Sequence, residues 1–271
     1  MTKPKVHTVQ LCFALSYLFA KQLGATVVLH TDSIGEKVLS HIPYDDVYVD
    51  LDSIPKGIAP FWAFGKLYAT AREPVGSIHI DGDVFLKNPK LAEVFSNDYD
   101  LLVQSEEGPT WRNDQTYECS QQAIADYNLL DGYHIDYPLS WNCGVTQFLN
   151  KDLKDTYTDM YFNTVNKVLH DKSFLERIHR ILHIDKLPGA VIPDLIIEQQ
   201  CLHELTTTMN MKVKCILTGD IRKQAVEIGY THTLSKYKYE NTDAFISMLK
   251  YLNPDMLEKI LASQYWAYGN C

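Results

Sequence analysis

The chain contains 271 residues, of which 46% are hydrophobic and 22% are charged. This composition excludes a disordered chain, because enough apolar surface is present to offset the entropy lost on folding. The formal net charge is −9 at pH 7, and since duplex-binding proteins present a basic face, we expect no nucleic-acid partner.

The cysteine and hydropathy patterns indicate the cellular compartment in which the protein resides. The six cysteines are widely spaced and include no Cys-x-x-Cys pair, which predicts neither a zinc knuckle nor a dense disulfide framework. No stretch reaches the roughly 20 apolar residues of a membrane span, so we expect no transmembrane segment. We therefore expect a cytoplasmic protein. Aromatic residues near the C-terminus suit a peripheral association of the final helix with a membrane, although ordinary packing of that helix is the preferred interpretation: Tyr265, Trp266 and Tyr268.

The first predicted element is an amphipathic helix over residues 8–22, which ends near Gly24. Leu11, Leu15 and Phe19 fall on one stripe at helical spacing. Polar side chains fall on a second stripe: His7, Gln10, Tyr17 and Lys21. The alternative is a signal peptide, because basic residues precede the apolar run. A signal peptide needs no polar stripe, so the helix is the preferred interpretation.

Strand and helix patterns then alternate along the first part of the chain. The predicted strands lie at 26–32, 47–49, 77–80 and 100–104, and the predicted helices at 34–39 and 62–71. Such alternation with short connections favours an α/β domain with a largely parallel sheet.

After residue 104 the sequence shows less regular secondary-structure patterns, up to about residue 140. Residues 105–140 form a long polar stretch, typical of a functional loop or lid, with a helix-compatible segment at 121–130. Helices are then predicted at 153–169, 173–184 and 193–205, a strand at 211–217, and a final helix from Asn253-Pro254 onward.

The segment Asp81-Gly82-Asp83 is the most informative motif. Residues two apart in an extended chain face the same side, so both carboxylates can converge on one cation. The glycine between them lets the backbone turn and lets a ligand approach closely. A magnesium-sized ion is commonly held by one or two carboxylates and the phosphates of its substrate. The motif thus predicts metal-assisted departure of a diphosphate, although Asp-Gly-Asp is also a common turn sequence.

Residues 77–86, Ser-Ile-His-Ile-Asp-Gly-Asp-Val-Phe-Leu, resemble the Asp-x-Asp segment of nucleotide-sugar glycosyltransferases of the GT-A fold. The resemblance implies a Rossmann-like, mostly parallel sheet flanked by helices in a single domain, 1–271. Within it, a nucleotide and metal half would occupy about 1–104, and an acceptor-side and C-terminal part about 105–271. That fold normally opens with a strand ahead of the first helix. Only Met1 to His7 precede the helix here, so we expect that strand to be missing, very short, or removed by truncation or a shifted start codon.

Dispersed short motifs extend the resemblance to about residues 26–238, and they are similar to those of family 8 glycosyltransferases and of bacterial polysaccharide-locus proteins. Lys66 matches a basic residue that reaches the donor, and Trp141 to Val145 resembles the Asn-x-Gly segment of the donor-sugar pocket. Glu198-Gln199 resembles the acidic residue and Gln that face the reacting sugar. The segment from His232 to Lys238 resembles a C-terminal His-x-x-Gly-x-x-Lys, with Ser235 in place of the glycine and no Pro-Trp after the lysine.

The resemblance assigns roles as follows. The expected metal ligands, for Mn²⁺ or Mg²⁺, are Asp81, Asp83 and His232. The expected contacts to a nucleotide diphosphate sugar are Asp32, Lys66, Asp81 and Lys238. The residues expected to face the transferred sugar are Glu198, Asn142 and Gln199. The acceptor, a saccharide or glycoconjugate, would meet aromatic side chains of 105–140: Trp111, Tyr117, Tyr127 and Tyr133.

Each of these residues also has a purely structural interpretation. Lys66 can be a solvated charge, and Asn142 with Gly144 can be turn chemistry. Glu198 can be a surface carboxylate, Asp32 can end a strand at a turn, and Asp194 is interpreted as a helix cap.

The expected activity is metal-dependent transfer of a sugar in polysaccharide or glycoconjugate synthesis. One alternative is a non-catalytic sugar- or nucleotide-binding relative of the same fold. Another is a sugar-phosphate nucleotidyltransferase, which ranks lower because the sequence has no Gly-rich, basic phosphate loop after its first strand.

Overall fold

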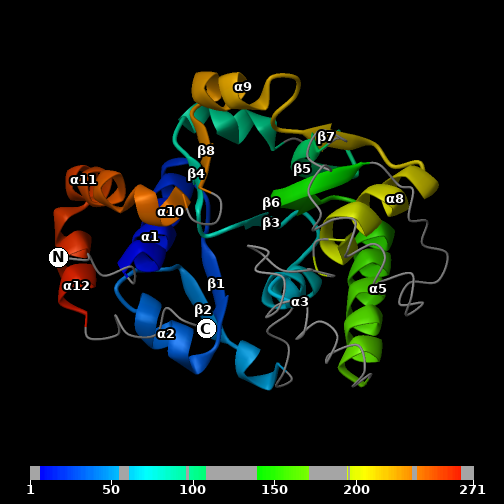
Figure 1. Cartoon of the computed structure of the whole chain (residues 1–271), viewed down its shortest axis with the longest axis horizontal. Coiled ribbons are helices and arrows are strands. Elements are labelled where there is room, and N and C mark those ends of the chain that lie inside the picture. Colours follow the sequence, from blue (N-terminus) through cyan, green and yellow to red (C-terminus); the bar gives the residue numbers. More distant parts are fainter. Residues whose placement is uncertain are drawn as a thin grey trace, which may run out of the picture. The chain divides into compact units, whose positions relative to one another are not determined.

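The computed structural model describes residues 7–54, 61–95, 98–107, 139–170, 194, 196–233 and 237–263. The chain divides into two compact units, whose elements are shown in Figure 1. Unit 1 comprises Met1–Ile54, Ile80–Ser96 and Gly219–Cys271, and unit 2 comprises Pro55–His79 and Asn97–Thr218. Unit 2 is thus largely inserted in the sequence of unit 1, and the division near residue 104 stays a prediction. The single GT-A-like domain stays a prediction.

Helix α1 (His7–Gln22) is the centre of unit 1 and confirms the first predicted element. Two residues of its polar stripe, Gln10 and Tyr17, are nonetheless buried. Gln10 donates to the Val38 carbonyl at 2.8 Å, and Tyr17 donates to the Pro43 carbonyl at 2.7 Å. These bonds to distant backbone satisfy the polar groups and permit their burial.

A parallel pair of strands lies beside short helices in the same unit. β1 (Val28–Thr31) pairs in parallel with β2 (Asp46–Val49), with Val28 opposite Asp46. Between them runs α2 (Ser33–Leu39), and the 3₁₀ turn η1 (Leu51–Ser53) follows β2. These elements confirm the predicted strands and helix at 26–49.

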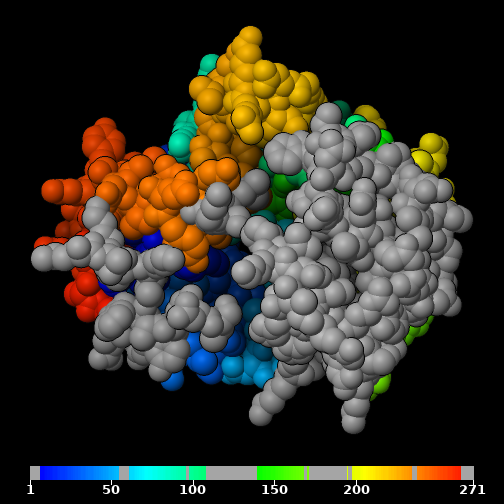
Figure 2. Space-filling model, in the orientation of Figure 1, coloured from blue at the N-terminus to red at the C-terminus, as the bar shows by residue number. Residues whose placement is uncertain are grey.

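The remaining elements of unit 1 come from two later segments. β4 (Val84–Leu86) and the 3₁₀ turn η2 (Pro89–Val94) follow the Asp-Gly-Asp segment. β8 (Tyr230–His232) pairs antiparallel with β4. Four helices complete the unit: α9 (Ile221–Ile228), α10 (Tyr237–Glu240), α11 (Thr242–Leu252) and α12 (Pro254–Ala262). Helix α9 has no buried residue, and its atoms stand at the surface in Figure 2.

The core of unit 1 forms where α1 packs against β4, α11 and α12. Phe85 of β4 meets Phe245 of α11 edge-on, with ring centroids 5.5 Å apart, and lies 6.2 Å from Phe19 of α1. Both helices therefore hold the strand that follows Asp83.

Unit 2 is built on a four-stranded sheet in the order β3-β6-β5-β7. Its strands are β3 (Ile78–Ile80), β5 (Leu101–Glu107), β6 (Ser140–Phe148) and β7 (Val213–Cys215). β5 pairs antiparallel with β6 and parallel with β7. Every residue of β6 is buried, which its polar side chains did not predict.

Among the described residues of unit 2, α5 (Lys151–His170) and α8 (Cys201–Thr208) pack against β6, and α3 (Phe64–Arg72) packs against α5. Directly before α8, residues Ile196–Gln200 form a π-helical turn, η4. The core of the unit includes Tyr157 and Tyr161 of α5 and Leu67 of α3.

The fold is α/β with open sheets, as expected. The mostly parallel sheet stays a prediction, because the described registers include parallel pairs, β1–β2 and β5–β7, as well as antiparallel ones, β4–β8 and β5–β6. The predicted helices at 121–130 and 173–184 lie outside the described residues, as do residues 1–6. Within the described ranges, no helix combines the length and apolar character that crossing a membrane requires.

Candidate functional site

The Asp81-Gly82-Asp83 segment forms the turn between β3 and β4. The Asp81 carbonyl accepts the Val84 N–H at 2.9 Å, which closes the turn. Gly82 is not among the residues with positive φ, so its backbone conformation does not require glycine. A Cβ at this position would instead lie 2.6 Å from the Phe13 ring. The absence of a side chain is therefore needed for close packing on α1.

Strand pairing brings His232 to this turn. In the β4–β8 register, Val84 is opposite His232, and the Thr233 N–H donates to the Asp83 carbonyl at 3.0 Å. Gly229, at φ 73°, ends α9 and turns the chain into β8. Its carbonyl accepts the Lys87 N–H at 2.9 Å, which fixes the other end of the pairing.

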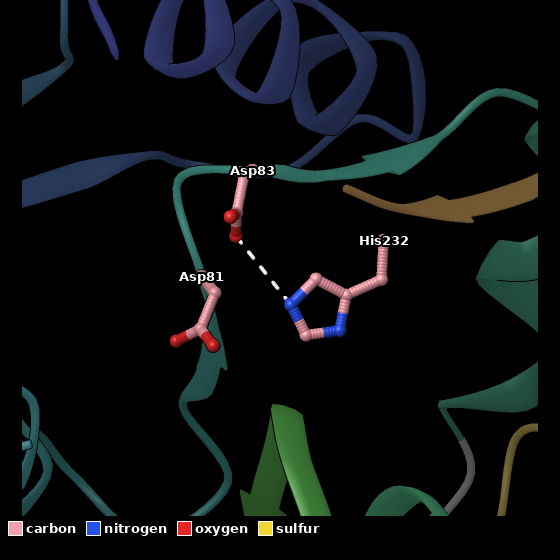
Figure 3. A group of neighbouring side chains, drawn as sticks. All are labelled: Asp81, Asp83 and His232. Carbon is pink, nitrogen blue, oxygen red and sulfur yellow. Dashed lines mark ion pairs between the residues drawn. The ribbon is translucent and has the colours of Figure 1, made fainter. Parts of the chain in front are cut away.

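Three potential ligand atoms, one each from Asp81, Asp83 and His232, lie within 4.8 Å of one another. Figure 3 shows the Asp83 carboxylate and the His232 ring pointing toward each other, with His232 Nε2 at 3.5 Å from Asp83 Oδ1. Lys238 of α10 places its Nζ 2.8 Å from Asp83 Oδ2. The structure thus brings together four residues that the sequence assigned to metal and diphosphate binding.

The charges around Asp83 favour its ionised form. Burial opposes ionisation, but the hydrogen bonds and charges of His232 and Lys238 outweigh it and hold the pKa of the Asp83 carboxyl below its ordinary value. Burial alone would lower the pKa of Lys238. The hydrogen bond and the negative charge of Asp83 outweigh this effect, so the pKa of Lys238 lies above its ordinary value. Both groups are therefore charged at neutral pH.

The donor set of this cluster fits a small divalent cation. Two carboxylates supply the hard oxygen ligands that Mg²⁺ and Mn²⁺ prefer, and an imidazole nitrogen is a ligand that transition metals accept. Three ligands leave further coordination positions for the oxygens of a bound substrate. The ammonium group of Lys238 adds a positive charge that an anionic substrate would meet.

Asp32 has a structural role in the described contacts. Its Oδ1 accepts the Gly35 N–H at 2.6 Å, which caps the N-terminus of α2. The expected contact of Asp32 with a nucleotide stays a prediction.

In unit 2, Lys66 of α3 and Glu198 of η4 form an ion pair with 2.6 Å between Nζ and Oε1. Lys66 also donates to the Cys143 carbonyl at 2.6 Å, and Tyr157 donates to the Glu198 carbonyl at 2.8 Å. Glu198 is therefore a buried carboxylate with a lysine counterion rather than a surface carboxylate. π-Helical turns occur frequently at functional sites, which makes the location of Glu198 informative.

Asp194 is a second buried carboxylate in this cluster, and the prediction that it caps its own helix is wrong. Its Oδ1 accepts from the Tyr161 hydroxyl at 2.6 Å, and its Oδ2 accepts from the Ala63 N–H at 2.7 Å, at the start of α3. Burial, aided by the charge of Glu198, raises the pKa of the Asp194 carboxyl to about 7. We name the group of Lys66, Glu198, Asp194 and Tyr161 the unit 2 cluster.

Asn142 is buried on β6, and both the nitrogen and the oxygen of its side-chain amide form hydrogen bonds. Its Nδ2 donates to Glu107 Oε1 at 2.7 Å, and its Oδ1 accepts the Gly144 N–H at 3.1 Å. Sequence reasoning missed Glu107, because it placed this residue in the polar stretch 105–140, whereas β5 extends to Glu107. Gln199 lies beside Glu198 in η4 and is partly buried.

The predicted residues therefore fall into two groups. Asp81, Asp83, His232 and Lys238 gather in unit 1. Lys66, Asn142, Glu198 and Gln199 belong to unit 2. The aromatic residues expected on the acceptor side lie outside the described residues: Trp111, Tyr117, Tyr127 and Tyr133. The C-terminal aromatics expected at a membrane lie outside them as well: Tyr265, Trp266 and Tyr268.

No curated protein and no solved structure gives a significant match to the chain. One family, described as a family of unknown function (DUF6734), matches residues 3–263. This match includes both units and every residue of the two groups above. The chain therefore belongs to the DUF6734 family.

Proposed function

We propose that this protein is a metal-dependent glycosyltransferase of GT-A type that uses a nucleotide diphosphate sugar as donor. The observation that carries the proposal is the convergence of Asp81, Asp83 and His232 within 4.8 Å, beside Lys238. The resemblance of residues 77–86 to an Asp-x-Asp segment supports it. So does the location of the pair at the end of β3, because ligands of α/β sheets bind beyond the carboxyl ends of strands.

In this proposal Asp81, Asp83 and His232 hold Mn²⁺ or Mg²⁺, and Asp81 also contacts the donor ribose. The cation would supply positive charge to stabilise the departing diphosphate. Lys238 provides a second positive charge for the same group, and its hydrogen bond to Asp83 keeps it charged and oriented before the substrate arrives.

The unit 2 residues are proposed to face the transferred sugar. Lys66 neutralises Glu198 and so permits an ionised carboxylate at a position that is only 3% exposed. An ionised Glu198 can stabilise an oxocarbenium-like centre or accept a proton. Asn142 presents an amide whose orientation is fixed by Glu107 and Gly144. We further propose that Lys66 and Asp32 contact the donor, that Gln199 faces the sugar, that the acceptor is a saccharide or glycoconjugate, and that the protein is cytoplasmic.

The proposal is tested by thermal unfolding with a panel of nucleoside diphosphates, with and without Mn²⁺. A ligand of the native state present at 100 times its dissociation constant stabilises the protein by about 2.7 kcal/mol, which is visible in the unfolding midpoint. We expect one nucleotide to raise the midpoint only with Mn²⁺, and Asp83→Asn to abolish that rise. The matched control is Asp255→Asn, which removes an exposed carboxylate of α12 in the same unit and should leave the rise intact.

Turnover separates the proposal from its alternatives. With the bound nucleotide supplied as its diphosphate sugar, Mn²⁺-dependent release of the free diphosphate supports sugar transfer. Binding without release, even with saccharide acceptors added, would point to a non-catalytic relative. A folded protein that binds neither Mn²⁺ nor any nucleotide would overturn the proposal.

A further inference from the structure

The side of the metal-binding turn that faces α1 is filled by one aromatic ring. A Cβ built on Gly82 would meet three atoms of the Phe13 ring, at 2.6 Å from Cε2 and Cζ and at 2.9 Å from Cδ2. Real Cβ atoms essentially never approach other atoms so closely. The ring therefore packs directly on the backbone that joins the two aspartates.

The ring is held on one side by the core of unit 1. Phe13 lies in the middle of α1 and, although partly buried, packs against the buried cluster that includes Leu11, Cys12, Ala14 and Leu15. The helix packs against β4, α11 and α12, so its backbone is held on several sides. Close-packed interiors transmit such strain rather than absorb it. A larger residue at position 82 would displace the turn more readily than the helix.

Displacement of this turn would move both carboxylates, because Asp81 and Asp83 are the residues on either side of Gly82. Asp83 is additionally tied to β8 through the Thr233 N–H, 3.0 Å from its carbonyl oxygen. Movement at Gly82 would therefore alter the separation of the two carboxylates rather than shift them together.

We propose that Phe13 is a positioning residue for the metal site, whose ring sets the spacing of the Asp81 and Asp83 carboxylates by occupying the place of a side chain at position 82. This inference rests on the proposed function for its metal. It predicts that residues 13 and 82 are coupled in size, so that enlarging one is tolerated only when the other is reduced.

The test is a double-mutant cycle on the full chain, with Mn²⁺ alone as the probe in calorimetric titrations. We expect Gly82→Ala to weaken Mn²⁺ binding by about tenfold or more, in the range found when groups that orient metal ligands are altered. Adding Phe13→Ala to Gly82→Ala should restore most of that loss. Phe13→Leu, the milder change, should weaken binding to a smaller degree.

A control on the same helix separates positioning from general stability. Phe19 also lies on α1 and packs on Phe85, but it is not among the atoms closest to Gly82. Phe19→Leu should lower the unfolding midpoint of the metal-free protein and leave the Mn²⁺ dissociation constant within about twofold of the wild-type value.

Two outcomes would overturn the inference. One is unchanged Mn²⁺ binding by Gly82→Ala, and the other is a double variant that binds no more tightly than Gly82→Ala alone. If the wild-type protein itself binds no Mn²⁺, the proposed function fails first, and the positioning role is lost with it.

Discussion

Lys66 and Glu198 are each other's counterion, with 2.6 Å between Nζ and Oε1 and side chains only 13% and 4% exposed. A second buried carboxylate, Asp194, interacts electrostatically with both of them. The cluster therefore contains two acids and one base. Burial and the charge of Glu198 raise the pKa of Asp194, which favours retention of a proton on that carboxyl and so lessens this imbalance.

This arrangement predicts unequal effects of removing the two charges. Lys66→Met leaves two carboxylates without a cation and should lower the free energy of unfolding by about 3 kcal/mol or more. Glu198→Gln leaves Lys66 with Asp194 and with the Cys143 carbonyl, and should cost less. Urea unfolding at pH 7 measures both. Asp155→Asn, which breaks the exposed pair with Lys151, serves as control and should leave the free energy of unfolding nearly unchanged. A larger loss in Glu198→Gln than in Lys66→Met would contradict this description.

The unit 2 cluster also predicts a pH dependence of stability. The pKa of the Asp194 carboxyl is about 7 in the folded protein and 3.8 as a reference for the unfolded chain. Since the folded pKa is the higher one, the stabilisation is complete below pH 3.8 and is lost as the pH rises toward 7. The free energy of unfolding, measured from pH 4 to 8, should fall more steeply in wild type than in Asp194→Asn. Parallel curves would show that Asp194 ionises normally.

Gly229 should be intolerant of substitution for two separate reasons. It adopts φ 73°, and a Cβ there would lie 3.0 Å from the Asn88 Cβ. Gly24 adopts φ 80° with open space around it, so Gly24→Ala should show the conformational cost alone, about 1–2 kcal/mol. Gly229→Ala should cost more and should also weaken Mn²⁺ binding, because β8 carries His232. Equal costs in thermal unfolding would mean that Asn88 moves aside freely.

Lys238 is predicted to weaken metal binding and to strengthen binding of the nucleoside diphosphate. Its ammonium group competes with a cation for Asp83, so Lys238→Met should leave Mn²⁺ binding unchanged or tighter. The same variant should weaken binding of the nucleoside diphosphate in the presence of Mn²⁺, since it removes one of the positive charges offered to the phosphates. Parallel calorimetric titrations with Mn²⁺ and with nucleotide measure the two effects. Asp83→Asn is the comparison and should lose both. Loss of Mn²⁺ binding in Lys238→Met would instead assign the lysine to maintenance of the turn.

Local periodicity was sufficient to predict many elements. α1, β1, α2, β5 and α5 were predicted at or near their observed bounds from local patterns, such as the helical spacing of apolar residues in α1 and the apolar run of β1. Asp81 and Asp83 were predicted from their spacing after a strand. The gathering of His232 and Lys238 beside them was expected from the resemblance alone, since nothing in the local sequence encodes the β4–β8 pairing.

Other features depend on partners far away in the sequence. β4 and β8 have three residues each, too few to display a repeat, and they exist because they pair with each other. Gln10 and Asp194 look like surface residues in the sequence, yet both are buried against distant donors and acceptors. Burial of a polar group is decided by the availability of its hydrogen-bond partner, and a single sequence does not reveal that partner.

The interleaving of the two units in the sequence has a consequence for how the proposed metal site forms during folding. Val84 pairs with His232 across roughly 150 residues of chain, a span that contains most of unit 2, and closing so long a loop carries an entropic cost before any ligand is in place. During synthesis, Asp81 and Asp83 emerge well before the histidine that completes the set. Mn²⁺ binding would therefore report on the closure of the whole chain, and N-terminal fragments that end before His232 should not bind the ion as the full chain does.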